Sequence, residues 1–299
     1  PEGDPSIGRA GALMTVGLGS WMSGQFERSI EEWGEAYRIA AELGAGREWC
    51  LAGFAQALAL LGSDVGSGLT LAKESAERAD ALGFTWGLGF ALTVTGICQA
   101  LAGDLAEARA SYSDALVIQA RLGDKAGAGM SLGGLAGLAS GRGDAVAAID
   151  LYGQSLGAFE AVGDRGEEAR ILSEIAWTYL GNGETGLARR YFFESVQAHT
   201  DVASVRGVGR SLIGLAATEA VEHRPDRAVQ IAAAAEVYAG QEGIVVIYSD
   251  ENPGRELVEQ ARASLSEVDV TRATEIGRRL TIGQVLELAR IADAAPRRP

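Results

Sequence analysis

One segment of the chain has the spacing of a hydrolase nucleophile. Residues Gly129–Gly133 read G-M-S-L-G, which fits the G-x-S-x-G form in which Ser131 would attack an acyl carbonyl. That chemistry requires a strand before the serine, a sharp turn at it and a paired histidine. Ser131 instead lies where apolar residues recur at three- and four-residue steps, which predicts a helix, and no histidine is paired with it. We therefore expect that this chain is not an enzyme.

Three Gly-x-Gly pairs, two histidines and two lysines are the other residues that could bind a cofactor or a metal. A dinucleotide-binding loop would occur once, after a strand, and would complete the pattern G-x-G-x-x-G, which none of these pairs does. His199 and His223 belong to no ligand-spaced cluster, and neither lysine follows a phosphate-binding loop. We expect no metal and no cofactor. The glycine pairs are Gly87/Gly89, Gly127/Gly129 and Gly207/Gly209.

Four acidic residues each directly follow a glycine at a predicted turn. A carboxylate at the start of a helix can accept hydrogen bonds from the free amides of the first turn. We interpret these residues as helix caps and not as an acid/base pair. They are Asp104, Asp144, Asp164 and Glu184.

The balance of charge argues against two classes of partner. The 299 residues include 26 Lys and Arg against 40 Asp and Glu, a formal net charge of −14. Phosphate backbones and anionic lipids repel so acidic a chain, so we expect no direct nucleic-acid or membrane binding. Two cysteines, and no run of roughly 18 uninterrupted apolar residues, favour the cytoplasm. The first methionine is Met14, so we expect a piece of a longer protein.

One short turn motif recurs along the chain every 40 residues, and a second runs in step with it. The first motif interrupts the helical pattern and is, in five of its six occurrences, Ser or Gly followed by Gly, Asp or Glu. The second is Leu or Val followed by Gly or Ala. The intervals predict six helical hairpins that bury their apolar faces against their neighbours, which describes a solenoid. The first set is Ser23-Gly24, Ser63-Asp64, Gly103-Asp104, Gly143-Asp144, Gly183-Glu184 and His223-Arg224; the second is Leu43-Gly44, Leu82-Gly83, Leu122-Gly123, Val162-Gly163 and Val202-Ala203.

Within each hairpin the two predicted helices carry different signatures. The first helix has an apolar residue followed by a small one, as at Leu135-Ala136. In four of the six hairpins the second has small, aromatic and small residues four and three apart, as at Ala148, Tyr152 and Ser155. In the other two, Ala72 and Ala232 replace the aromatic residue. Small residues let two helix backbones approach closely, and the ring fills the space toward the next hairpin. The predicted fold class is all-α.

These signatures resemble the tetratricopeptide repeat, although the period is 40 residues instead of roughly 34 and no proline follows the second helix. Longer-helix variants of this kind are similar to the sensor segments of large bacterial regulators, the LuxR-type proteins and related signal-transduction ATPases. The resemblance covers about residues 7–240. It implies a right-handed superhelical solenoid of six antiparallel helix hairpins in residues 1–240.

The tail is more loosely similar to the segment that follows such a sensor. Residues 241–294 are expected to form a C-terminal helical cap, with the β-branched run Ile244–Tyr248 packed across the last hairpin. Residues 295–299 look like the beginning of the linker that, in such regulators, leads to a helix-turn-helix. Effector domains of the parent chain are therefore expected partners.

In arrays of this family the first helix of each hairpin lines a concave groove. The resemblance therefore predicts an apolar, aromatic-lined trough that binds a protein, a peptide or a small-molecule ligand, with two arginines near one end. The chain would be a sensory and regulatory module of a cytoplasmic bacterial transcriptional regulator. The alternative is a structural scaffold whose groove is filled by its own chain or by a second subunit in a homodimer. The predicted binding residues are Trp21, Trp49, Gln56, Phe90, Ile97, Met130, Arg170, Trp177 and Arg210.

Overall fold

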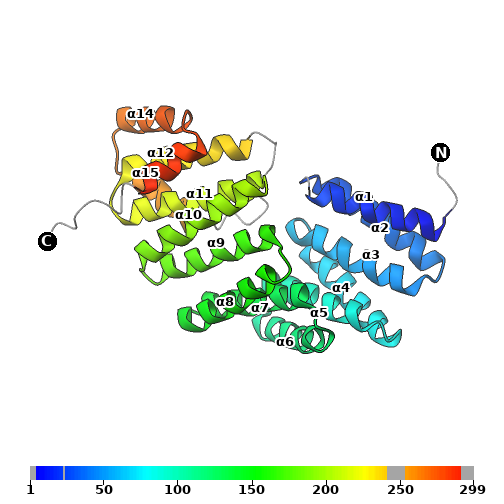
Figure 1. Ribbon diagram of the computed structural model, residues 1–299. Coiled ribbons are helices and arrows are strands. Elements are labelled where there is room, and N and C mark those ends of the chain that lie inside the picture. The colour runs from blue at the N-terminus through cyan, green and yellow to red at the C-terminus, as the bar shows by residue number, and fades with distance from the viewer. Residues whose placement is uncertain (1–4, 23, 241–252, 291–299) are drawn as a thin grey trace. The chain divides into compact units, whose positions relative to one another are not determined.

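The computed structural model describes residues 5–22, 24–240 and 253–290, and these form fifteen α-helices and one 3-10 turn (Figure 1). The run Ile244–Tyr248 and the linker residues 295–299 lie outside the described residues. The helices are α1 (Ile7–Met22), α2 (Phe26–Glu42), α3 (Gly46–Ala59), followed by η1 (Leu60–Gly62), α4 (Val65–Ala81), α5 (Thr85–Ala102), α6 (Leu105–Leu122), α7 (Lys125–Gly141), α8 (Ala145–Glu160), α9 (Arg165–Gly181), α10 (Thr185–Asp201), α11 (Val205–Val221), α12 (Pro225–Gly240), α13 (Pro253–Ala263), α14 (Glu267–Gly277) and α15 (Ile282–Arg290).

Consecutive helices pack against one another as antiparallel hairpins. We call the odd-numbered helices from α1 to α11 the A helices and the even-numbered ones from α2 to α12 the B helices. α3 packs between α2 and α4, and α5 packs between α4 and α6, so an A helix is covered by B helices on two sides. Successive A helices also meet, as α3 does with α5 and α9 with α11. The predicted all-α solenoid of helix hairpins is confirmed.

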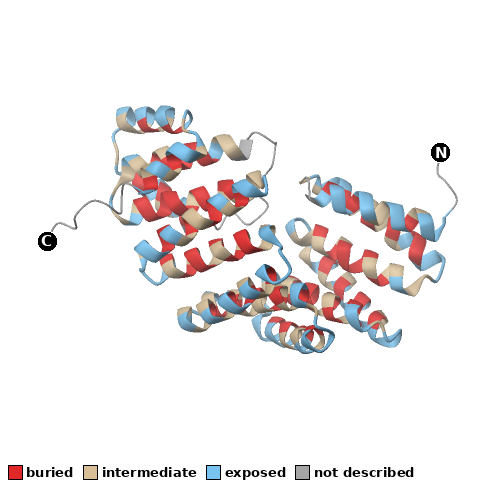
Figure 2. Cartoon of the chain, viewed as in Figure 1, coloured by how far each residue is buried: buried red, intermediate tan, exposed pale blue. Residues whose placement is uncertain are grey.

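The chain divides into two compact units, residues 1–138 and 139–299, and the division falls inside α7. In each unit the buried residues lie on the helix faces that meet, while the outward faces are exposed (Figure 2). The core of the first unit includes Trp33, Phe54 and Val94, and that of the second is built around Phe192, Leu212 and Leu215.

The predicted turns end the helices through residues with positive φ. Gly83, Gly123 and Gly163 have φ of +63°, +68° and +71°, and the residue 40 positions later, Ala203, keeps the same conformation at +53°. His223 also adopts it, at +57°. This left-handed region suits glycine because a Cβ crowds the following carbonyl there. The left-handed backbone turn therefore persists at Ala203 and His223, where the sequence has lost its glycine.

The predicted caps are formed at two of the four acidic residues. Asp144 and Asp164 accept hydrogen bonds from the amides of Ala147 and Glu167, each at 3.1 Å. Asp104 and Glu184 occupy the same position but make no such side-chain bond. The prediction was wrong for these two, because the N-cap position alone does not fix the side-chain rotamer that capping needs.

The small and aromatic residues of the repeat pack as predicted. The ring of Tyr112 on α6 lies between Gly96 of α5 and Gly134 of α7, where an added Cβ would come within 2.8 Å and 2.4 Å of the ring. In the second unit, the Phe192 ring lies against Gly214 in the same way, at 2.2 Å. Such distances leave no room for a side chain, so these glycines set how closely the helices approach.

The helices after residue 252 close the last hairpin. α13 packs on α11 and α12, and α14 packs on α12. Val258 of α13 and Val285 of α15 join the buried core of the second unit. Gly277 of α14 lies so close to α12 that a Cβ there would come within 2.1 Å of the Gln230 carbonyl oxygen. The described part of the tail is thus helical and packs on the last hairpin.

One helix of the described residues, α5, is long and apolar enough to cross a membrane. Half of its 18 residues are buried within the fold, between α4 and α6. A core helix of a globular array passes the same test of length and composition, so this feature is weak evidence for a membrane span.

Candidate functional site

An aromatic cluster with one exposed ring, Trp86, is formed by α3, α5 and the residue before α5 in the first unit. Trp86 of α5 stacks on Phe90 of the same helix, with ring centroids 5.6 Å apart and planes at 25°. Phe54 of α3 contacts both rings, at 4.7 Å from Phe90 and 6.3 Å from Trp86. Trp86 is 41% exposed. We call Phe54, Phe84, Trp86 and Phe90 the aromatic surface.

Local sequence explains how these rings come together. Trp86 and Phe90 are four residues apart and therefore share one face of α5. Phe84 precedes the helix, and its ring lies over Gly87, where a Cβ would come within 2.4 Å of it. The Arg47 guanidinium lies over the same Phe84 ring, 5.3 Å from its centroid. Gly87 and Arg47 thus hold Phe84 beside Trp86 at the start of the helix.

The predicted binding residues of the first unit do not all join this surface. Phe90 is part of it, and Trp21 of α1 is 37% exposed. Trp49 instead contacts Tyr37 of α2, at 5.6 Å between rings, and the Arg78 guanidinium of α4 lies 4.6 Å from its ring. Both Tyr37 and Arg78 belong to B helices, so Trp49 points between hairpins.

The remaining three predicted residues of the first unit have different surroundings. Gln56 reaches toward α2, where its amide nitrogen lies 2.7 Å from the position of a Cβ on Gly34. Ile97 packs against the buried cluster of Ala108, Tyr112 and Leu138. Met130 is half-buried on α7. Ile97 is therefore partly a core residue.

In the second unit, both predicted arginines already have carboxylate partners. Arg170 pairs with Glu167 at 2.7 Å, and Arg210 pairs with Glu174 at 2.6 Å. Trp177 contacts the buried Phe192 edge-on, with centroids 4.8 Å apart. An acidic ligand would have to compete with these carboxylates for the arginines, so this end is poorly suited to an anion.

Sequence reasoning missed Trp86, the most exposed ring of the aromatic surface. The signal was present, because Trp86 is one helical turn before Phe90, which was predicted. Phe54 was not among the predicted binding residues, since the repeat pattern places it in an apolar-small pair with Ala55. It is a core residue, 6% exposed, that supports the Trp86 and Phe90 rings.

The serine of the G-x-S-x-G segment is buried in a helix. Ser131 lies inside α7, fully buried, and its hydroxyl oxygen is 2.9 Å from that of Thr93 on α5. The Gln119 amide of α6 lies 2.8 Å from the Ser131 oxygen and 2.9 Å from the Thr93 oxygen, whichever way the amide is turned. Buried polar groups satisfied in this way fix the register of three helices. No nucleophile elbow exists at Ser131.

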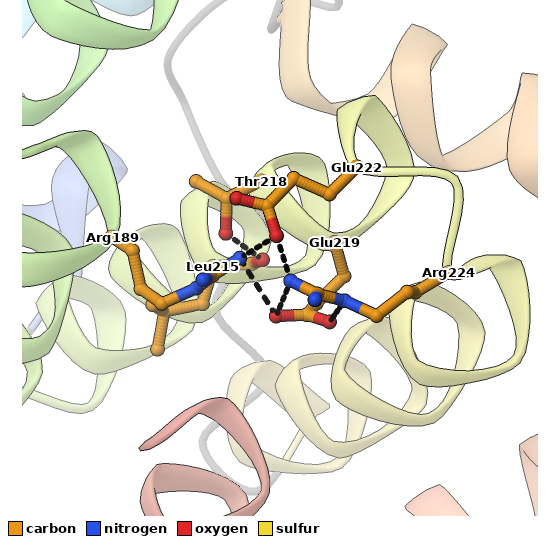
Figure 3. Close-up of polar contacts among 6 residues, drawn as sticks. All are labelled: Arg189, Leu215, Thr218, Glu219, Glu222 and Arg224. Carbon is orange, nitrogen blue, oxygen red and sulfur yellow. Dashed lines mark hydrogen bonds and ion pairs between the residues drawn. The ribbon is translucent and has the colours of Figure 1, made fainter. Parts of the chain in front are cut away.

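A network of ion pairs joins two hairpins of the second unit (Figure 3). Arg189 of α10, 3% exposed, pairs with Glu219 of α11 at 3.2 Å and with Glu222 at 2.6 Å. Arg224 contacts both carboxylates as well, and its Nε lies 2.6 Å from Glu219. Glu219 is fully buried. The two positive and two negative charges balance, so the network is a structural element and not an open charged site.

His199 of α10 should make the second unit sensitive to acid. Burial, and then the charges of Arg210 and Arg170, lower the pKa of His199 to about 4 from an ordinary value of 6.5. The folded state therefore favours the neutral ring, and this stability is complete above pH 6.5 and lost as the pH falls toward 4. At about 1.4 kcal/mol per pKa unit, we expect a loss of roughly 3 kcal/mol over that window.

The measurement is urea denaturation at a series of pH values for the wild type and His199→Gln. Trp177 is the only tryptophan in the sequence of residues 139–299, so its fluorescence reports on the second unit. Because carboxylates also titrate in this range, the difference between the two proteins is the informative quantity. Between pH 6.5 and 4, the free energy of unfolding of the wild type should fall by roughly 3 kcal/mol more than that of His199→Gln. Parallel curves would contradict the assignment to His199.

Across the part of the chain that the structure describes, no three His, Cys, Asp or Glu side chains gather in a way that could hold a metal ion. Cys50 and Cys98 are both buried, and burial raises the pKa of the Cys98 thiol to about 11. A thiol with so high a pKa is a poor nucleophile at neutral pH.

Solved structures with a similar fold exist. The chain is similar to a Signal Transduction ATPase with Numerous Domains from Pyrococcus horikoshii that carries a tetratricopeptide repeat sensor, with a TM-score of 0.60 and 14% identity. The match covers 94% of this chain and 44% of that one. The likeness is one of fold. The chain is thus a tetratricopeptide-like helical array that spans less than half the length of this neighbour.

A second solved structure, BtubC (BKLC) from P. vanneervenii, has a TM-score of 0.54 and 16% identity. The match covers 79% of this chain and 96% of BtubC. No family model matches the sequence. No curated protein matches it either.

Proposed function

We propose that the chain is a non-enzymatic binding module that recognises an amphipathic helix or apolar peptide through the aromatic surface of its first unit. The observation that carries this is Trp86, which is 41% exposed and stacked on Phe90. Exposed, pre-stacked aromatic rings are the residues that most often dominate protein interfaces, since they lose little freedom on binding.

We further propose that the module is the sensory part of a cytoplasmic bacterial transcriptional regulator of the LuxR type or a related signal-transduction ATPase. Two observations support this. The chain has a tetratricopeptide-like fold, and a solved structure with that fold is described as a signal-transduction ATPase with a tetratricopeptide repeat sensor. Binding at the aromatic surface would then be passed to effector domains of the parent chain.

A library of displayed amphipathic helical peptides tests the proposal. Peptides selected on the wild-type chain should bind Trp86→Ala at least tenfold more weakly, a loss of about 1.4 kcal/mol, because truncating a central aromatic residue removes most of its contact area. Binding is measured by isothermal titration calorimetry with each selected peptide.

The matched control is Val146→Ala, which removes an apolar side chain that is 83% exposed on α8 in the other unit. It should leave binding unchanged. Thermal denaturation checks that Trp86→Ala remains folded. Selected peptides that bind Trp86→Ala as tightly as the wild type would refute the proposal.

The alternative partner is a second copy of the chain. If a homodimer covers the aromatic surface, sedimentation velocity should show a concentration-dependent dimer that Trp86→Ala dissociates. A wild-type chain that stays monomeric at all concentrations would instead exclude the homodimeric scaffold.

A further inference from the structure

A surface cleft of about 660 Å³ lies between two B helices of the first unit. Its walls are α2 and α4, and its floor is the end of α3 with η1. Cavities that bind small molecules in proteins usually enclose about 300 to 1,000 Å³. The cleft thus has the size of a ligand site, and its two walls, α2 and α4, are not helices that carry the aromatic surface.

A glycine and a tyrosine account for the shape of the cleft. Gly34 leaves α2 without a side chain where the Gln56 amide approaches it, so the wall is cut back at its middle. Farther along α2, the Tyr37 hydroxyl donates a hydrogen bond to Glu74 of α4 at 3.0 Å. This bond links the two walls near one end, and the cleft continues from there toward the N-terminal ends of both helices.

Acidic side chains dominate the lining. Glu31, Asp64 and Glu74 face a single basic residue, Arg38. Asp64 accepts hydrogen bonds from the Ser67 amide at 3.0 Å and from the Ser67 hydroxyl at 2.6 Å. The hydroxyl bond, followed by the amide bond, lowers the pKa of Asp64, so this carboxylate stays ionised at neutral pH.

Two of the carboxylates lie toward the same end. α2 and α4 run in the same direction, because each is antiparallel to α3, and Tyr37 pairs with Glu74 across the cleft. Glu31 and Asp64 both precede that pair along their helices, so they lie on facing walls at the N-terminal end. Between the two ends the lining includes Leu60 and Leu71, which supply apolar surface.

We propose that this cleft binds a small organic cation, an amine or guanidine carried on an apolar body. The cationic head would lie between Glu31 and Asp64, and the apolar body would cover Leu60 and Leu71. The Gln56 amide at the floor would offer a hydrogen bond to a polar group of the ligand. Three carboxylates against one arginine make the site unfavourable for an anion.

The probes are three compounds of one shape: 4-phenylbutan-1-amine, the neutral 4-phenylbutan-1-ol and the anionic 4-phenylbutanoate. Binding to the full chain is measured by isothermal titration calorimetry at low ionic strength. We expect the amine to bind and the other two to bind at least tenfold more weakly. Equal binding of the amine and the alcohol, or no binding of the amine, would overturn the proposal.

Two variants place the binding in the cleft. Glu31→Gln should weaken amine binding about fivefold, as expected for removal of an exposed charge partner. Thr70→Trp, on the α4 wall, should abolish it by filling the cleft. Glu27→Gln, one turn before Glu31 on α2 and outside the lining, is the matched control and should change nothing. Amine binding that survives Thr70→Trp would show that the cation binds elsewhere and would overturn the assignment.

This inference does not rest on the proposed function. Trp86→Ala leaves the cleft lining intact, and Thr70→Trp leaves the aromatic surface intact. Loss of amine binding with retained peptide binding, or the reverse, therefore tells which of the two sites has failed.

Discussion

Replacing Glu219 by alanine should lower the free energy of unfolding of the second unit by about 3 kcal/mol, because it leaves buried positive charge without its partner. Glu219 is fully buried and contacts both Arg189 and Arg224. After the change the two arginines share the remaining carboxylate of Glu222. Arg189 is held 3% exposed by its surroundings and cannot simply move into solvent.

Urea denaturation followed by Trp177 fluorescence measures this effect in the second unit. The matched control is Glu194→Ala, which breaks the surface pair with Arg190, a residue whose side chain is 70% exposed. An exposed pair four residues apart on a helix contributes about 0.5 kcal/mol or less. Similar losses for Glu219→Ala and Glu194→Ala would contradict the view that the network is a buried structural element.

Replacing Gly277 by alanine should push α14 away from α12, at a cost of about 3 kcal/mol. The new Cβ would meet the backbone of α12, within 2.1 Å of the Gln230 oxygen and 2.8 Å of its carbonyl carbon. A flexible side chain could turn away from such a contact, but backbone cannot move without shifting a helix. α14 must therefore separate from α12.

Hydrogen–deuterium exchange of the α14 peptide amides is the measurement. Gly277→Ala should raise exchange in α14 strongly, whereas exchange in α2 and α4 stays as in the wild type. The control is Gly283→Ala in α15, where an added Cβ meets only the Thr281 hydroxyl, at 4.0 Å. That change should stabilise α15 by up to about 1 kcal/mol through helix propensity. Unchanged exchange in α14 of Gly277→Ala would show that the contact is not tight.

The hairpins could be predicted from sequence because their signals are local. Turn glycines such as Gly123 and Gly163 mark positive φ, and the spacing between turns gives helix length directly. The close packing of Tyr112 on Gly96 and Gly134 follows from the small–aromatic pattern. These features depend on the backbone and on nearest neighbours, which a repeat sequence specifies at every period.

The direction in which individual side chains point was harder to predict, most clearly on α3. From Gly44 to Ser63 the chain runs 19 residues, whereas from Gly83 to Gly103 it runs 20. α3 also ends in a 3-10 turn, and Ser63 has φ of −129° instead of a left-handed value. One missing residue rotates a helical register by about 100°. Positions counted from the repeat, such as Trp49 and Gln56, therefore point toward the B helices.

The carboxylate partners of the arginines could not be predicted from the sequence, for a different reason. Arg210 and Glu174 are 36 residues apart, and Arg189 and Glu222 are 33 apart. Pairing over such separations depends on how hairpins stack, which the periodicity fixes only to within a residue or so. A prediction that relies on free arginines needs the packed structure.

Fluorine NMR of the chain labelled with 5-fluorotryptophan tests most directly whether the aromatic surface is the binding site. The sequence holds five tryptophans, so five resonances are expected, each assigned by a Trp→Phe substitution. On addition of a selected helical peptide, the Trp86 resonance should shift while that of Trp33, 3% exposed, and that of Trp177 stay in place. A shift of Trp177 with no change at Trp86 would contradict the proposed binding surface.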